Sequence, residues 1–160
     1  MSKPKVLNLG CGNDYRSAPD VEWVNLDRGN CKVDISWDIQ VCPYPFEDNE
    51  FSAILCTNVL EHISKDLFPT VVRELYRICK NGAEWHITVP APNSENYYSD
   101  FTHKHQMGLR VFDFFDPEKP LRENGIIYGY EDISLTVLVA TDIENQPNGP
   151  DRFFRIKVNK

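Results

Sequence analysis

The chain has 160 residues, of which 41% are hydrophobic and 12% aromatic, and its formal net charge is −7. This composition fits a globular domain with a real core and excludes an intrinsically disordered chain. No apolar run approaches the roughly 18 residues of a membrane helix, and the acidic balance argues against a nucleic-acid partner, which usually needs a basic face.

The first predicted element is a buried strand at Val6–Leu9, a short apolar run that contains a β-branched residue. A turn made of Gly10, Cys11 and Gly12 follows it. Glycine lets the chain turn tightly and lets a ligand approach the backbone without meeting a Cβ atom. Nucleotide-like cofactors bind at such strand ends in open α/β sheets, so we expect a cofactor site here.

A second predicted strand, Trp23–Asp27, ends in a carboxylate that can accept both hydroxyls of an adenosine ribose. Only ten residues separate Gly12 from Trp23, and one of them is Pro19, so the first crossover helix must be very short or absent. Tyr15 stands where the dinucleotide fingerprint needs its third glycine. The pattern therefore leaves the identity of the nucleotide open.

The third predicted strand spans Cys31–Ile35, and Asp34 and Asp38 lie at its end. A loop fixed by prolines follows, with the sequence PYPFEDNEF from Pro43 to Phe51. The fourth strand is predicted at Phe51–Cys56.

Four stretches in this order resemble the class I S-adenosylmethionine-dependent methyltransferases, specifically the small "type 11"-like group. They are LNLGCG at 7–12, the strand that ends at Asp27, the loop at 43–51, and LCTNVLEHI at 55–63. The likeness covers roughly residues 5–90 and is thin beyond them. It implies an α/β, Rossmann-like methyltransferase fold. Its sheet would be mostly parallel and twisted, with an antiparallel C-terminal hairpin.

The resemblance also implies S-adenosylmethionine as cofactor, S-adenosylhomocysteine as product, and a set of cofactor-binding positions. These are Gly10, Cys11, Gly12, Asp27, Arg28, Asp38, Ile39, Asn58 and Val59. In the family, an aspartate after strand three accepts the adenine amino group. Asp38 fits that role best and Asp34 is the second choice, although either carboxylate could instead cap a turn.

The second half of the chain is predicted to hold a helix, a strand and a C-terminal hairpin. Apolar residues at 67, 71, 75, 78 and 79 indicate one buried helical face, and Asn81–Gly82 a left-handed helix end. Strand five follows at Trp85–Val89. Residues 91–125 read as a variable, substrate-side insertion with a short helix at Leu109–Phe115. Two strands at Tyr128–Ala140 and Arg152–Val158, joined by a turn at Asn145–Pro150, complete the single domain of residues 1–160.

Two histidines, His62 and His103, are the candidates for a general base, because an unperturbed imidazole titrates near neutral pH. His103 lies in a D-x-T-H segment, Asp100–His103, that precedes a substrate-side helix in the family.

His103 and His105 form an H-x-H pair without a clear third ligand, and no two of the five cysteines have C-x-x-C spacing. We therefore expect reduced thiols and no metal site.

These observations predict a methyltransferase that acts on an unidentified acceptor, which we expect to be a small molecule or a sugar. The alternative is a non-catalytic S-adenosylmethionine-binding partner or regulatory protein. A nicotinamide dehydrogenase is disfavoured by the missing glycine. We expect a cytoplasmic location, because no signal-like apolar segment precedes the first strand, and a homodimer could cover an exposed pocket.

Overall fold

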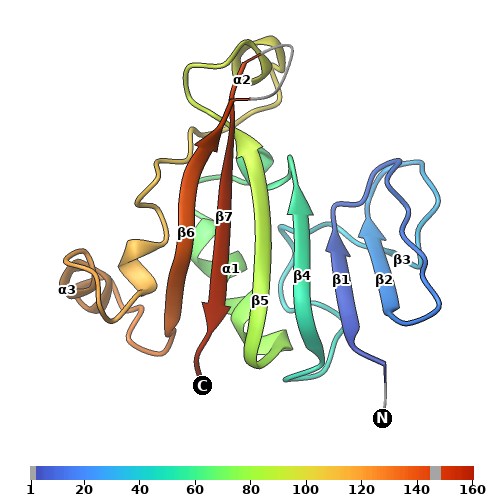
Figure 1. Cartoon of the computed structure of the whole chain (residues 1–160), viewed down its shortest axis with the longest axis horizontal. Helices are drawn as coiled ribbons and strands as arrows, with labels where there is room; N and C mark the ends of the chain where they lie inside the picture. The colour runs from blue at the N-terminus through green and yellow to red at the C-terminus, as the bar shows by residue number, and fades with distance from the viewer. Residues whose placement is uncertain (1–2, 145–148) are drawn as a thin grey trace.

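In the computed structural model, which describes residues 3–144 and 149–160, the described strands form one sheet (Figure 1). They are β1 Lys5–Leu9, β2 Glu22–Asp27, β3 Ile35–Ser36, β4 Phe51–Thr57, β5 Cys79–Pro90, β6 Leu135–Ile143 and β7 Asp151–Val158. The order across the sheet is β3-β2-β1-β4-β5-β7-β6. Strands β1 to β5 pair in parallel, and β7 pairs antiparallel with β5 and β6. This arrangement confirms the predicted fold class.

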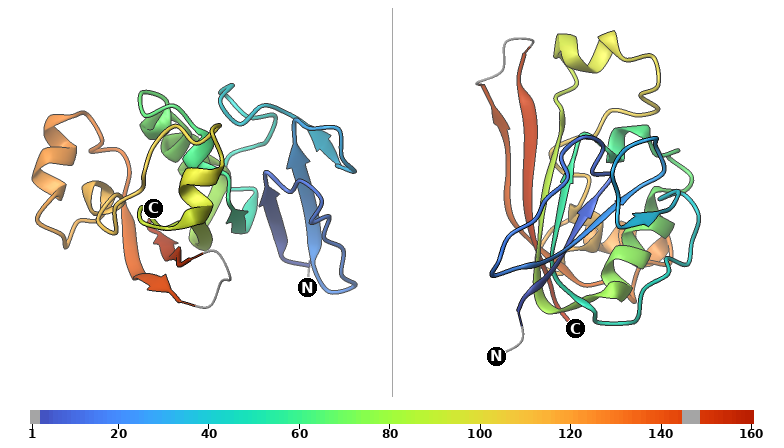
Figure 2. Two further views of the ribbon diagram at one scale, coloured as in Figure 1. Left: turned by 90° about the horizontal axis from the view of Figure 1, so that it is seen from above. Right: turned by 90° about the vertical axis from the view of Figure 1, so that its right-hand side faces the viewer.

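The helices of the described residues are few and short. They are α1 Phe68–Ile78, α2 Glu95–Ser99 and α3 Arg122–Ile127, with 3₁₀ turns η1 at Leu60–His62 and η2 at Asp113–Phe115. Helix α1 packs its apolar stripe against one face of the sheet. In both views of Figure 2, no helix of the described part of the chain covers the opposite face. None of these helices has the length and apolar character needed to cross a membrane.

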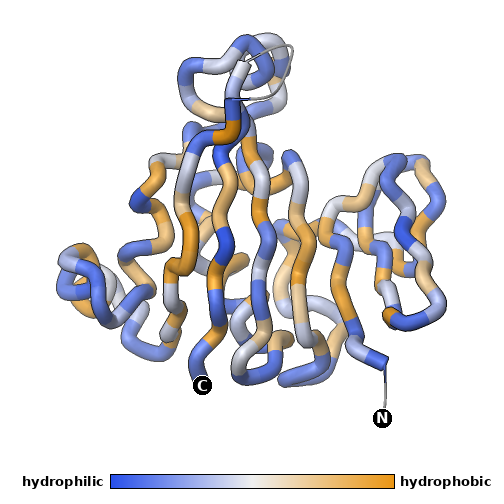
Figure 3. Tube along the Cα trace, viewed as in Figure 1, coloured by the Kyte–Doolittle hydropathy of each residue, from blue (hydrophilic) through white to orange (hydrophobic). Residues whose placement is uncertain are grey.

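The uncovered face of the sheet carries polar side chains. Along β5 and β7, buried residues alternate with partly exposed ones, and Figure 3 shows this alternation as blue and orange segments. On this face, Arg155 makes a two-pronged ion pair with Glu84, at 2.9 and 3.0 Å. This is the pattern of a sheet with one solvated side, so these strands need no second layer of helices.

Helix α1 and strand β5 join more directly than predicted. The helix ends at Ile78, and β5 begins at once with Cys79. Gly82 does have a left-handed φ of 79°, but it lies where the β4–β5 register shifts, rather than at a helix end. The predicted helical face is also too long at both ends, because Leu67 precedes the helix and is exposed, and Cys79 already belongs to β5.

Three predicted elements are wrong in position or type. The third strand is Ile35–Ser36, not Cys31–Ile35, because the preceding residues are drawn into a side-chain network described below. The segment at 109–115 forms only the short η2 turn. Helix α3 ends at Ile127, and turns at residues 128–134 take the start of the expected strand Tyr128–Ala140, so that strand begins at Leu135. Part of the predicted turn at 145–150 lies outside the described residues.

The prediction that the first crossover helix is very short or absent is confirmed, since residues 10–21, all of them described, form turns and an isolated bridge. In place of a helix, the buried side-chain amide of Asn25 holds this loop by hydrogen bonds. Asn25 Oδ1 accepts from Asn8 Nδ2 at 3.0 Å and from the Arg16 backbone N–H at 2.8 Å. Asn25 Nδ2 donates to the Arg16 carbonyl at 2.9 Å and to Asp34 at 2.8 Å. The loop is thereby tied to the middle of β1 and β2.

Asp34 extends this network to the next segment of the chain. Its Oδ2 also accepts the Asn25 backbone N–H, and its Oδ1 accepts the Tyr15 hydroxyl at 2.7 Å. Burial opposes ionisation, yet the hydrogen bonds from Asn25 and Tyr15 hold the pKa of Asp34 below its usual value. Asp34 is therefore a structural carboxylate of this loop.

We predict that Asn25→Ala lowers the free energy of unfolding by about 3 kcal/mol, because it leaves several buried partners without hydrogen bonds. Urea unfolding followed by circular dichroism measures the change. Asn30→Ala, an exposed asparagine just beyond β2, is the matched control and should stay within about 0.5 kcal/mol of the parent protein. Equal stability of the two variants would contradict the role of the network.

Candidate functional site

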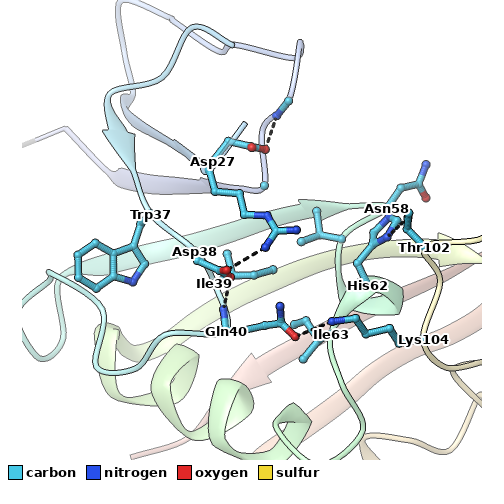
Figure 4. Close-up of a pocket in the computed structure, with 14 residues that line it drawn as sticks. Asp27, Trp37, Asp38, Ile39, Gln40, Asn58, His62, Ile63, Thr102 and Lys104 are labelled. Atoms are coloured by element: carbon cyan, nitrogen blue, oxygen red, sulfur yellow. Dashed lines mark hydrogen bonds and ion pairs between the residues drawn. The ribbon is translucent and has the colours of Figure 1, made fainter. Parts of the chain in front are cut away.

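A cavity of about 400 Å³ opens at the carboxyl ends of β1, β2 and β4 (Figure 4). Because these strands are parallel, the residues that follow them meet at the same edge of the sheet. Most of the sequence-predicted cofactor positions lie here: Gly10, Gly12, Asp27, Arg28, Asp38, Ile39, Asn58 and Val59. The volume falls within the range of about 300–1,000 Å³ that is typical of small-molecule sites.

Gly10 and Gly12 have different structural roles in the turn. Gly10 has a φ of 65°, and a Cβ atom there would collide with the side chain of Val59. Gly12 has a φ of 48°, but a Cβ atom there would meet no atom within 4 Å, because its Cα faces open space. Gly10 therefore lets the turn pack on the β4 side of the site, and Gly12 leaves one wall without a side chain.

Asp27 anchors the turn from the end of β2. Its Oδ2 accepts the Gly12 backbone N–H at 2.9 Å, and its Oδ1 accepts the Gly29 N–H at 2.6 Å. A carboxylate has about four acceptor positions, so two remain for a ligand. The side chain can hold the loop and still bind hydroxyl groups in the cavity.

Asp38 and Arg28 both line the cavity and form an ion pair with each other. Arg28 Nη1 donates to Asp38 Oδ2 at 2.9 Å, and the Gln40 backbone N–H donates to Asp38 Oδ1 at 2.9 Å (Figure 4). The Gln40 N–H first, and then Arg28, lower the pKa of Asp38. Asp34, the second choice for this role, lies outside the lining of the cavity and is held by Asn25.

Cys11 is the one predicted cofactor position that does not line the cavity. Its side chain is buried, and its backbone N–H donates to the Leu26 carbonyl at 3.0 Å. Burial, followed by the nearby charge of Asp27, raises the pKa of the thiol to about 11. Cys11 is thus a protonated core residue of the turn.

Several lining residues escaped the sequence analysis. They are Trp37, Gln40, Ile63, Thr102 and Lys104. Lys104 Nζ donates to Gln40 Oε1 at 3.1 Å, and the Lys104 backbone N–H donates to the Glu61 carbonyl at 2.8 Å. These contacts bring the segment after β5 against Gln40, before β4, and against Glu61, after β4. No local motif indicates such a long-range pairing.

A second cavity of about 370 Å³ adjoins the first, because Asn58 and His62 line both. His103, the other candidate base, lines the second cavity together with Glu61 and Asp100. Both candidate bases therefore line the second cavity, whose lining includes neither Asp27 nor Asp38. The pKa of His62 is lowered, mainly by burial.

Glu61 is the least expected feature of this second cavity. Its side chain is 1% exposed, and neither carboxylate oxygen has a hydrogen-bond partner among the described residues. Burial raises the pKa of Glu61 to about 8, and the charges of Asp100 and Asp151 add to the effect. A buried, unpaired carboxyl group is costly unless something compensates it.

Known proteins were compared with this sequence and fold. Residues 17–87 match the family model described as "Methyltransferase domain". An uncharacterized protein of Methanocaldococcus jannaschii is 33% identical over 140 residues, which are 77% of this chain and 58% of that protein. The chain thus spans less than two thirds of the length of this curated relative.

Solved structures share the fold at low sequence identity. A SAM-dependent methyltransferase from Archaeoglobus fulgidus has a TM-score of 0.60 at 16% identity, with 97% of this chain and 86% of that chain covered. The [4+2]-cyclase SpnF has a TM-score of 0.67 at 12% identity, with 98% and 75% covered. At these identities the likeness shows the architecture alone.

The two glycines of the turn should respond differently to the same substitution. Gly10→Ala is expected to lower the free energy of unfolding by about 3 kcal/mol, because it adds a clash with Val59 to an unfavourable φ. Gly12→Ala should cost only about 1 kcal/mol, since it meets the φ penalty alone. Urea titrations of both variants measure the difference, and equal losses would contradict the assigned packing of Gly10.

Proposed function

We propose that the chain is a class I S-adenosylmethionine-dependent methyltransferase of the type 11 group, and that it methylates a small acceptor, such as a sugar or another polar metabolite. The match of residues 17–87 to the methyltransferase family model and the shared fold support this proposal. The observation that supports this most strongly is the cavity at the strand ends. It combines an open glycine wall at Gly12 with two carboxylates, Asp27 and Asp38. A second cavity next to it offers room for the acceptor.

The residues of the first cavity fit the cofactor of the family, S-adenosylmethionine. Asp27 has acceptor positions free for the ribose hydroxyls, and Gly12 leaves space beside it for the cofactor to lie against the backbone. We assign the adenine end to Asp38 and Ile39, with Arg28 ion-paired to Asp38 across the cavity. Asn58 and Val59 are then on the side of the methyl group.

Bound S-adenosylmethionine supplies a methyl group on a positively charged sulfur, and the transfer is an in-line displacement by the acceptor. The protein then needs mainly to orient two molecules and to exclude water. Asn58 and His62 line both cavities and so stand at the boundary where the two molecules would meet. The insertion at 91–125 contributes Thr102 and Lys104 to one cavity and His103 to the other, so we propose it as the acceptor-side segment.

The alternative function is binding of S-adenosylmethionine without methyl transfer, as a partner or regulatory protein. The structural likeness to a protein named as a [4+2]-cyclase means that the fold alone does not assign methyl transfer. Formation of S-adenosylhomocysteine with any acceptor distinguishes the two. A catalyst produces it in proportion to time, whereas a binding protein leaves the cofactor intact.

Calorimetric titration with S-adenosylmethionine, S-adenosylhomocysteine and NADH tests the proposal. We expect micromolar dissociation constants for the first two, which correspond to about −8 kcal/mol, and no binding of NADH. Binding of NADH alone would reassign the cavity to a dinucleotide. Absence of all three would contradict a nucleotide cofactor for this chain.

Asp27→Ala should weaken binding of S-adenosylmethionine by at least tenfold, because charge-assisted hydrogen bonds of about 1.5–3 kcal/mol are lost. Calorimetry measures the affinity, and thermal unfolding without ligand reports separately on the loss of the two bonds to the loop. Asp20→Ala, an exposed aspartate of the loop before β2, is the matched control. A folded Asp27→Ala protein with unchanged affinity would contradict the ribose assignment.

A further inference from the structure

We propose that Glu61, His62 and His103 form a binding site for a single divalent transition-metal cation in the wall of the second cavity. Each of the three residues offers one ligand atom, and these atoms all lie within 4.8 Å of one another. Glu61 Oε1 and His103 Nε2 are 3.8 Å apart. Metal–ligand bonds of about 2.0–2.2 Å can span such a distance at an open bond angle.

The carboxylate of Glu61 is the group that points to a ligand. It is 1% exposed, it lines the cavity, and both its oxygens lack hydrogen-bond partners among the described residues. Buried carboxylates in folded proteins are normally hydrogen-bonded, paired or bound to a metal. A cation at this position would satisfy both oxygens at once.

The ring of His103 is already oriented as in a metal ligand. Its Nδ1 lies 2.8 Å from the Tyr97 carbonyl oxygen, which can only accept, so this nitrogen carries the proton. The lone pair is therefore on Nε2, the atom that faces Glu61. A backbone carbonyl that fixes the tautomer in this way is the usual outer support of a metal-bound histidine.

His62 is held in a similar manner by the D-x-T-H segment. Its Nδ1 lies 3.0 Å from Thr102 Oγ1 (Figure 4). The single proton of that hydroxyl is donated to Asp100 Oδ1 at 2.6 Å. The hydroxyl must therefore accept from His62, which leaves the lone pair on the other ring nitrogen. Asp100 Oδ2 is also 3.8 Å from His103 Nε2, so a further negative charge borders the site.

The H-x-H pattern in the sequence suggests His105 as the partner of His103 in a metal site, but the structure brings Glu61 and His62 to His103 instead. His105, two residues on, turns away and bonds the Ile63 carbonyl at 2.9 Å while packing on Phe68. The ligands that the fold supplies instead are adjacent in η1, some forty positions earlier. This is why the H-x-H pattern lacked a third ligand and favoured no metal.

Another group of side chains could also compete for a metal, namely Cys11, Asp27 and Cys31. It is the weaker of the two, because both oxygens of Asp27 already accept backbone N–H groups. Two imidazoles with a carboxylate suit Mn²⁺, Fe²⁺ or Zn²⁺. If the proposed function holds, a cation here would have open positions toward the cavity and could hold an acceptor by its oxygen atoms.

The test is direct titration of the chelator-treated full chain with Mn²⁺ and, separately, with Zn²⁺. Loss of the free Mn²⁺ signal in electron paramagnetic resonance and the heat of Zn²⁺ binding report the affinity. We expect one cation per chain for at least one metal. Glu61→Gln and His103→Asn should each weaken binding by at least about tenfold. Glu95→Gln and His86→Asn, on exposed or half-exposed residues, are the matched controls and should bind as the parent does.

Three results would overturn the proposal. They are no binding of either metal at millimolar concentration, unchanged affinity in both Glu61→Gln and His103→Asn, or loss of binding in Cys31→Ser, which would assign the cation to the cysteine group. Thermal unfolding without metal verifies that each variant is folded. If Glu61→Gln does not fold, the affinity of His103→Asn alone decides the outcome. Because no S-adenosylmethionine is present, the result is independent of the cofactor titration.

Discussion

The hydrogen bonds of the buried Asn25 amide tie the loop between the glycine turn and β2 to the middle of β1 and β2. In a parallel sheet, a crossover helix would normally cover this part of β1 and β2. Here a loop lies in its place, and its polar groups must find partners inside the protein. Asn25 supplies two of these hydrogen bonds, to the N–H and the carbonyl of Arg16, and two more join it to Asn8 and Asp34. With the Gly12 N–H bonded to Asp27, a fixed loop takes the place of a helix end beside the cavity.

The single helical layer has a consequence for the rest of the sheet. With one face uncovered, β5 and β7 must carry polar side chains there, and the ion pair of Arg155 with Glu84 is part of that surface. The apolar residues are concentrated on the other face, against α1. The described residues therefore form a seven-stranded sheet with helices packed on one face alone.

The short turn η1 connects the two halves of the proposed site. Val59, just before it, closes against Gly10 in the first cavity, while Glu61 faces the second. The backbone carbonyl of Glu61 also accepts the N–H of Lys104, which brings the segment after β5 to the strand ends. A single turn thus positions the expected cofactor, the expected acceptor and the proposed cation.

Local patterns in the sequence determined the elements near the N-terminal half of the site. The apolar run before Gly10, the carboxylate at Asp27 and the shortness of the first crossover each follow from a few neighbouring residues, because strand ends and glycine turns have local rules. The glycine turn and the carboxylate at the end of β2 were predictable for this reason, and most of the remaining cavity lining was implied by the resemblance to the methyltransferases. The roles of Asp34 and Cys11 were less clear, because the same residue types serve turns, cores and ligand sites.

Only the tertiary structure decided which distant side chains meet. The pairing of Asp34 with Asn25, of Lys104 with Gln40, and of His103 with Glu61 depends on how loops fold across the sheet edge. It also decided where β3 and β6 begin, because the hydrogen bonds of Asp34 before β3 and the turns at 128–134 before β6 override the local strand preference. A sequence pattern records neighbours along the chain, whereas burial and charge at a site depend on neighbours in space.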